Sequence, residues 1–191
     1  MTMEPLNRSA FLAITAALAA ATIMSCSIPT EEGTVGPLPD QKSFTDGNVS
    51  LFLERRCGGL DCHGQVGRPL RIYSEYGLRL EPKSDGSRNT DATTTKEREA
   101  NYFAVIGLEP EELSKCYVGG KDLDDGAGCP VEDYSTLQLL KKPLSLEGGG
   151  IRHKGGPIVS PTFNDPGWQC LYQWASGHGY PDLCQKASAL Q

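Results

Sequence analysis

The chain has 191 residues, and its 24 acidic side chains outnumber its 18 basic ones, for a formal net charge of −6. Its hydrophobic fraction of 38% is enough to bury one core of modest size. The lysines and arginines are scattered along the sequence. Composition therefore argues against a nucleic-acid partner, because neutralising phosphates requires clustered basic side chains.

The N-terminal 25 residues have the pattern of a targeting segment. Glu4 and Arg8 are their only charged side chains, and an apolar run extends from Phe11 to Met24. A bilayer-spanning helix needs about 20 apolar residues, so this run is too short to be a membrane anchor. It predicts a signal peptide over residues 1–25.

The end of this run carries a second signal. Ile23-Met24-Ser25-Cys26 resembles the lipobox of bacterial lipoproteins, in which the cysteine is acylated and becomes the new N-terminus. The resemblance implies a lipid anchor on Cys26 in the cell envelope, with the protein facing the periplasm or the exterior. Ser27, directly after the cysteine, favours the outer membrane. A plain signal-peptidase site is the alternative.

Six cysteines remain beyond Cys26. Exported proteins meet an oxidising compartment, where an even number of cysteines indicates a covalent framework. We expect one disulfide between Cys116 and Cys129 and another between Cys170 and Cys184, although six cysteines also allow other pairings.

The sequence divides into a tether and one domain. Residues 26–47 contain prolines and glycines and few large apolar side chains, which predicts a flexible tether. Residues 48–191 form the domain. Its first helix is expected after Asn48, as the N-cap, with Val49, Phe52 and Leu53 on one face, and it should end at Cys57.

Further helix signals follow along the domain. Residues 81–99 are polar and predict a surface excursion, in which Thr94 and Glu97 can form a capping box. The helix that this box opens should end by Gly107 and carry Ala100, Phe103, Ala104 and Ile106 on its apolar face.

Three later helix starts complete the pattern. Pro110 suits a first helical turn, and Asp133 could cap a helix through Leu140 that ends at Pro143. Asp165-Pro166 predicts a helix that ends at Gly177 and carries Trp168, Tyr172 and Trp174, an aromatic face that is core by default. Because strand signals are weak, the predicted class is mainly α with long loops and disulfide stabilisation.

The segment Cys57-Gly58-Gly59-Leu60-Asp61-Cys62-His63 carries the chemistry. Covalent haem attachment needs two thiols for the vinyl groups and an imidazole directly after the second thiol as an axial iron ligand. This segment meets the requirement with four intervening residues instead of the usual two. The alternative is a Cys57–Cys62 disulfide with His63 as a surface residue.

The order of several segments is similar to that of a known family. ERRCGGLDCHG, RPLRIYSEYGLRL, STLQLLKKPLSLEGGGIRHKGGP and DPGWQCLYQWASG, within residues 44–178, resemble the cytochrome c-like domains of bacterial lipoproteins. The resemblance implies the cytochrome c fold, with first and last helices crossing beside one haem c. It also implies electron transfer to a redox partner protein in the periplasm or at the membrane.

No methionine follows Met24, so a methionine cannot be the second axial ligand of a mature protein. His153, in a glycine-rich loop, is the candidate that we prefer, and His178 is the other. Two imidazoles would give a lower reduction potential than a Met/His pair.

Two other functions remain open at this stage. One is a haem-free, disulfide-stapled lipoprotein domain used for binding or envelope structure. The other is an enzyme with five-coordinate haem, for instance a peroxidase. A distal catalytic set of His, Arg and acid is not recognisable, so we expect an electron carrier and not an enzyme.

Overall fold

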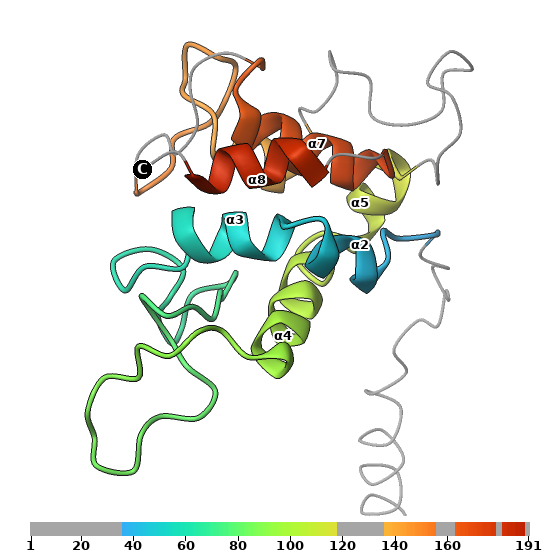
Figure 1. Cartoon of the computed structure of the whole chain (residues 1–191). Helices are drawn as coiled ribbons and strands as arrows, with labels where there is room; N and C mark the ends of the chain where they lie inside the picture. The colour runs from blue at the N-terminus through green and yellow to red at the C-terminus, as the bar shows by residue number, and fades with distance from the viewer. Residues whose placement is uncertain (1–35, 118–135, 156–162, 179–180, 190–191) are drawn as a thin grey trace, which may run out of the picture. The chain divides into compact units, whose positions relative to one another are not determined.

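The computed structural model describes residues 36–117, 136–155, 163–178 and 181–189, all within a unit that begins at Val35. In this part of the chain the only β-pairing is one isolated bridge between Tyr73 and Leu78, which confirms the mainly α class. The helices are α2 (Gln41–Asp46), α3 (Val49–Arg56), α4 (Thr95–Ile106), α5 (Pro110–Cys116), α6 (Gln138–Lys141), α7 (Pro166–Ser176) and α8 (Pro181–Ala189) (Figure 1).

Several predicted features lie in parts of the chain that the structure does not describe. The signal peptide, Cys26, Cys129 and Asp133 lie outside the described residues. Among the helices that are described, none combines the length and apolar character needed to cross a bilayer.

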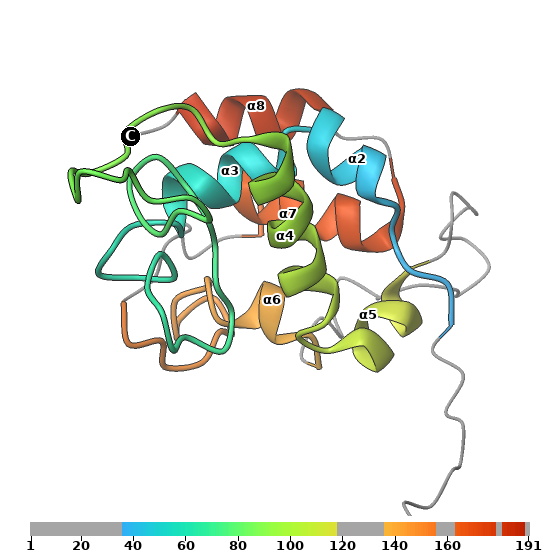
Figure 2. The same ribbon diagram turned by 90° about the horizontal axis from the view of Figure 1, so that it is seen from below.

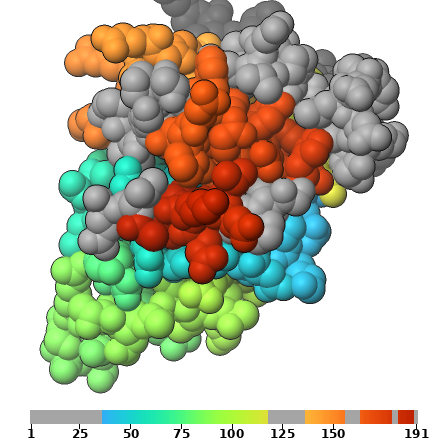
Figure 3. All heavy atoms as spheres, turned by 45° about the horizontal axis from the view of Figure 1, so that its top comes forward, coloured from blue at the N-terminus to red at the C-terminus, as the bar shows by residue number. Residues whose placement is uncertain are grey.

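Helix α3 lies at the centre of the helix packing. It contacts α7 and α8 on one side and α4 on the other (Figure 1). Its side chains Phe52 and Leu53 are buried together with Trp168, Leu171 and Trp174 of α7. Helices α7 and α8 lie next to each other on the face shown in Figure 3.

Residues 41–46 correct the predicted extent of the tether. They form α2, which Asp40 caps by accepting a hydrogen bond from the Ser43 N–H. Phe44 is fully buried and makes edge-to-face contacts with Tyr102 and Trp174. One aromatic side chain in a polar segment has no periodicity, so the sequence pattern alone missed this helix.

Helix α3 begins where it was predicted, but Asn48 plays a different part. Asn48 takes a left-handed conformation, with φ of 61°, and its side chain makes no capping hydrogen bond. Asparagine tolerates this conformation better than most residues. Asn48 therefore supports the sharp turn from α2 into α3.

The capping box of α4 is confirmed, and so is its end at Gly107. The predicted apolar residues are buried only in part, because Ala104 and Ile106 pack against the core but Phe103 is 56% exposed. The buried residues of this helix are Glu97, Asn101, Tyr102 and Val105. Polar partners decide the orientation of this helix: Glu97 binds Arg79, and Asn101 binds the backbone of Tyr73.

The other predicted helices begin at their predicted starts with one exception. Pro110 opens α5, and Asp165 caps α7, which ends at a left-handed Gly177. Helix α6 is shorter than predicted and begins only at Gln138, whose N–H donates to the Glu109 carboxylate over 2.7 Å.

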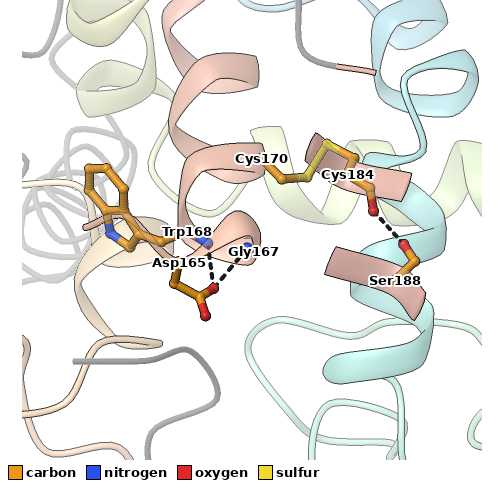
Figure 4. Close-up of a disulfide and its surroundings, with 6 residues drawn as sticks. All are labelled: Asp165, Gly167, Trp168, Cys170, Cys184 and Ser188. Atoms are coloured by element: carbon orange, nitrogen blue, oxygen red, sulfur yellow. Dashed lines mark hydrogen bonds between the residues drawn. A yellow bond between two sulfur atoms is a disulfide. The ribbon is translucent and has the colours of Figure 1, made fainter. Parts of the chain in front are cut away.

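The Cys170–Cys184 disulfide is confirmed and joins α7 to α8 (Figure 4). The sequence patterns had not indicated α8 itself. Ser188 of α8 donates a hydrogen bond to the Cys184 carbonyl over 2.7 Å. Cys116 is also disulfide-bonded, and its expected partner, Cys129, is not among the described residues.

A buried ion pair organises the predicted surface excursion. The Arg79 guanidinium donates to both oxygens of Glu97, at 2.8 and 2.9 Å, and to the carbonyl oxygens of Asn89, Asp91 and Ala92. Both charged side chains are almost fully buried, with 6% and 2% exposure. The excursion is therefore attached to the start of α4 by one arginine.

Glu97 should make the fold sensitive to acid. Burial alone would raise its pKa, but hydrogen bonds from Arg79 and from the N–H groups of Thr94 and Leu80 lower it from 4.5 to about 2. A carboxyl whose pKa is depressed by folding stabilises the fold above its unfolded pKa. This contribution is lost as the pH falls from about 4.5 towards about 2.

We predict that Glu97→Gln lowers the free energy of unfolding by about 3–5 kcal/mol at pH 7, since it leaves Arg79 buried without its counter-charge. The variant should also lose part of the stability change below pH 4.5. Denaturant unfolding at a series of pH values measures both effects. Glu99→Gln, on the exposed side of α4, is the control and should stay within about 0.5 kcal/mol of wild type. Equal losses in the two variants would contradict the prediction.

The disulfide between α7 and α8 closes a loop with a sequence separation of 14. Replacing both Cys170 and Cys184 with alanine should therefore cost about 3 kcal/mol, by the loop-entropy relation. Thermal unfolding of the full chain measures the loss. Ser188→Ala keeps the disulfide and removes only the hydrogen bond from the Ser188 hydroxyl to the Cys184 carbonyl (Figure 4), at a cost of about 1 kcal/mol. A double variant as stable as Ser188→Ala would argue against the prediction.

Candidate haem site

The two thiols of the Cys-x4-Cys-His segment lie in the loop that follows α3. Cys57 is the C-cap of the helix and is buried, whereas Cys62 is half-buried. Both are free thiols in the structure. The loop turns back on itself, because the His63 N–H donates to the Cys57 carbonyl and the Cys62 N–H donates to the Gly59 carbonyl.

Close packing inside this loop explains two of its glycines. A Cβ on Gly58 would lie 2.6 Å from the Glu54 carbonyl oxygen and 2.7 Å from the Ser74 hydroxyl. A Cβ on Gly64 would lie 2.1 Å from the Gly58 carbonyl oxygen. Only glycine fits at these positions, and the compact loop brings both thiols and His63 to the same cleft.

Residues 70–74, which we name the support segment, hold His63 in place. The His63 Nδ1 lies 2.9 Å from the Leu70 carbonyl oxygen, and the Ile72 N–H donates to the His63 carbonyl over 2.9 Å. The Ser74 hydroxyl donates to the Gly58 carbonyl over 2.7 Å. Since a carbonyl accepts only, Nδ1 carries the proton and Nε2 is left with its lone pair.

Helix α4 fixes the support segment in turn. The Asn101 side-chain carbonyl accepts from the Tyr73 N–H at 2.7 Å, and its amide donates to the Tyr73 carbonyl at 2.9 Å. Asn101 is fully buried. One side chain therefore satisfies both backbone groups of a residue in the middle of the support segment.

The second imidazole comes from the loop after α6. The rings of His63 and His153 are nearly parallel, with an interplanar angle of 13°, and their centroids are 5.8 Å apart. In Figure 2 the loop after α3 and the loop after α6 lie at the same side of the helices. His153, the preferred candidate for the second iron ligand, thus lies beside His63.

The cleft around these groups is mainly apolar. It measures about 810 Å³ when its solvent-open mouth is included. Its walls come from α3, the loop after α3, the turn after α4, α6, the loop after α6, and α7. The lining residues are Phe52, Leu53, Arg56, Cys57, Cys62, His63, Pro69, Leu70, Leu108, Gln138, Leu139, Lys142, Pro143, His153 and Leu171.

The charged side chains that line this cleft are cationic, and Asp61 lies beside the Cys62 thiol. Arg56 and Lys142 line it, and Arg68 acts electrostatically on both Cys62 and His63. The Arg68 Nε is buried and has no hydrogen-bond partner among the described residues. A buried donor of this kind favours an anionic ligand group nearby.

Burial controls the protonation of these side chains. It raises the pKa of the Cys57 thiol to about 12, with a further contribution from Cys62. Burial also raises the pKa of Cys62, assisted by Asp61. Burial lowers the pKa of His63, against the Leu70 hydrogen bond and together with the charge of His153, so this imidazole is neutral at pH 7.

Other sequence candidates lie away from the cleft. His178 follows the end of α7, where its N–H donates to the Gln173 carbonyl over 2.8 Å. Trp168 and Tyr172 stack on each other with ring centroids 5.0 Å apart, and Trp168 donates to the Leu140 carbonyl. These aromatic side chains are core, and α7 contributes Leu171 to the cleft instead.

No pattern in the sequence indicates that the Leu70 carbonyl, Ser74, Asn101 or the cationic side chains are parts of the site. Backbone acceptors carry no residue signal at all. Asn101 lies within a predicted helix, and only its burial marks it. From the sequence alone, Asn101 and Ser74 cannot be distinguished from the other asparagines and serines of the chain.

No protein-family model, curated protein or solved structure matches this chain. What the cleft can bind is therefore inferred from its own residues.

We predict that the two thiols of the reduced, haem-free chain differ in reactivity. Thiolates are the reacting species, so the buried Cys57, with its pKa near 12, should be alkylated by iodoacetamide much more slowly than the half-buried Cys62. Peptide mass spectrometry over a time course measures both rates. In denaturant the two rates should become similar, and equal rates in the folded chain would contradict the geometry.

Proposed function

We propose that this protein is an electron carrier that holds one haem c. Two thioether bonds from Cys57 and Cys62 would attach the haem, and His63 and His153 would hold its iron. The observation that carries the proposal is one cleft that combines two free thiols with two nearly parallel imidazoles 5.8 Å apart.

The hydrogen bond of His63 suits an axial ligand. Nδ1 is bound to the Leu70 carbonyl, which leaves the Nε2 lone pair for a metal and fixes the plane of the ring. The lowered pKa of His63 keeps this nitrogen unprotonated at neutral pH. A histidine held only as a surface residue needs neither property.

The spacing of the two rings also supports the proposal. Metal–imidazole bonds are about 2.0–2.1 Å long, so two imidazoles that hold one metal ion between them have ring centres roughly 6.4 Å apart. The stacked rings of His63 and His153 are slightly closer than this, at 5.8 Å, so a small outward movement would make room for the iron.

When bound, the haem would supply reversible one-electron transfer at its iron. The residues of the chain would set the conditions for it. Phe52, Leu53 and Leu171 exclude water from the cleft, and the cationic Arg56, Arg68 and Lys142 provide partners for carboxylates at the haem edge. Paired imidazoles, with no methionine, favour a low reduction potential.

The helix arrangement is compatible with a cytochrome c-like domain. Helix α3, which precedes the cysteine loop, packs against α7 near the C-terminal end, and both contribute side chains to the cleft. We further propose a lipid anchor on Cys26 in the cell envelope, and a redox protein of the same compartment as the partner. The lipobox-like sequence supports the anchor.

The decisive experiment is production of the full chain in a host with a cytochrome c maturation system. We expect the intact mass to rise by one haem and the pyridine haemochrome spectrum to show a c-type α-band. Cys57→Ala or Cys62→Ala should shift that band to longer wavelength, because one vinyl group remains. The double variant should carry no covalent haem.

The same preparation tests the axial ligands. His153→Ala should convert the low-spin spectrum of the oxidised protein to a high-spin one, whereas His178→Ala, outside the cleft, should leave it unchanged. A protein with neither the α-band nor the added mass would refute the haem proposal. It would favour a haem-free lipoprotein domain, for which a Cys57–Cys62 disulfide could be sought by thiol counting.

A further inference from the structure

The two cleft histidines are held in different ways. His63 has backbone hydrogen bonds to Cys57 and Ile72, and its ring is bound to Leu70. His153 follows a tight turn that is closed locally, since the Gly148 and Gly150 N–H groups donate to the Ser145 carbonyl. Gly149 in this turn has a φ of 83°, which favours glycine.

A second cavity also borders on His153. Its lining residues are Leu144, Ser145, Leu146, Glu147, Ile151, Arg152 and His153. The cavity measures about 720 Å³, including the part open to solvent. His153 is the one described residue that lines both this cavity and the haem cleft.

We propose that His153 is an exchangeable ligand, and that the cleft binds a small neutral molecule such as carbon monoxide when the His153 ring turns into the second cavity. This inference rests on the proposed haem. His63 keeps its place during the exchange because the support segment holds both its ring and its backbone. The apolar side chains of the cleft, including Leu139 and Leu171, can accommodate a small neutral ligand without an unpaired polar contact.

Carbon monoxide binding to the reduced, haem-loaded full chain tests the exchange. In wild type, the observed binding rate should level off as the carbon monoxide concentration rises, because departure of His153 becomes limiting. In His153→Ala the rate should stay proportional to concentration. Minor conformers are commonly populated at about 0.1–10%, so removing His153 should tighten the apparent affinity by about 10- to 1,000-fold.

A second variant tests the role of the cavity without removing the ligand. Leu146 is 69% exposed and lines the second cavity, so Leu146→Trp should fill it and keep the His153 ring in the cleft. Carbon monoxide should then bind more slowly and more weakly than in wild type. Val66→Trp is the matched control, since Val66 is 76% exposed and lines neither cavity.

The possible outcomes separate the two proposals. Haem-loaded protein that shows a low-spin spectrum but no spectral change at saturating carbon monoxide overturns the exchange and leaves the electron-carrier proposal standing. Identical linear kinetics in wild type and His153→Ala also overturn it, because His153 would then not be a ligand. Protein without covalent haem overturns both.

Discussion

The hydrogen bonds between the Asn101 side chain and the backbone of Tyr73 are the constraint on which the candidate site depends. They fix the support segment to α4, and the support segment then holds the His63 ring, the His63 backbone and the Gly58 carbonyl. The chain reaches this arrangement through a loop and not through regular structure. Hydrogen bonds from side chains therefore satisfy and fix this backbone, as the backbone hydrogen bonds of a sheet or a helix would.

The same helix carries a second polar anchor one turn earlier. Glu97 caps α4 and binds Arg79. A buried ion pair therefore joins the start of the helix to the chain that follows the support segment. Such a pair contributes little net stability compared with apolar packing, but removing one partner is costly. It acts here mainly to define one position of α4, which in turn positions Asn101 towards Tyr73.

The cleft combines groups that would be unfavourable without a bound partner. Two thiols, two imidazoles and three nearby cationic side chains lie at an apolar surface, and the Arg68 Nε is buried without a protein acceptor among the described residues. Burial keeps the thiols protonated and His63 neutral. The two thiols and two imidazoles are suitable donors for a metal-containing group with a flat, apolar body. The nearby cationic side chains would complement anionic substituents at the edge of that group.

Local signals in the sequence determined the starts and ends of several elements. The capping box at Thr94, the Asp165-Pro166 start and Gly177 were predicted correctly, since each depends on neighbours within a few residues. The Cys-x4-Cys-His segment likewise identified the candidate ligands by its spacing alone. The Cys170–Cys184 disulfide was expected from the sequence, but six cysteines also allow other pairings, and the structure confirms this one.

Only the tertiary structure decided which faces and which distant groups meet. Phe44 turned part of the expected tether into α2, and Glu97 and Asn101 placed the polar side of α4 inwards, because their partners lie in the segment before the helix. The approach of His153 to His63 across 90 residues of sequence depends on packing between two loops. Sequence spacing specifies the chemistry available at a motif, whereas burial and long-range hydrogen bonds decide which side chains complete the site.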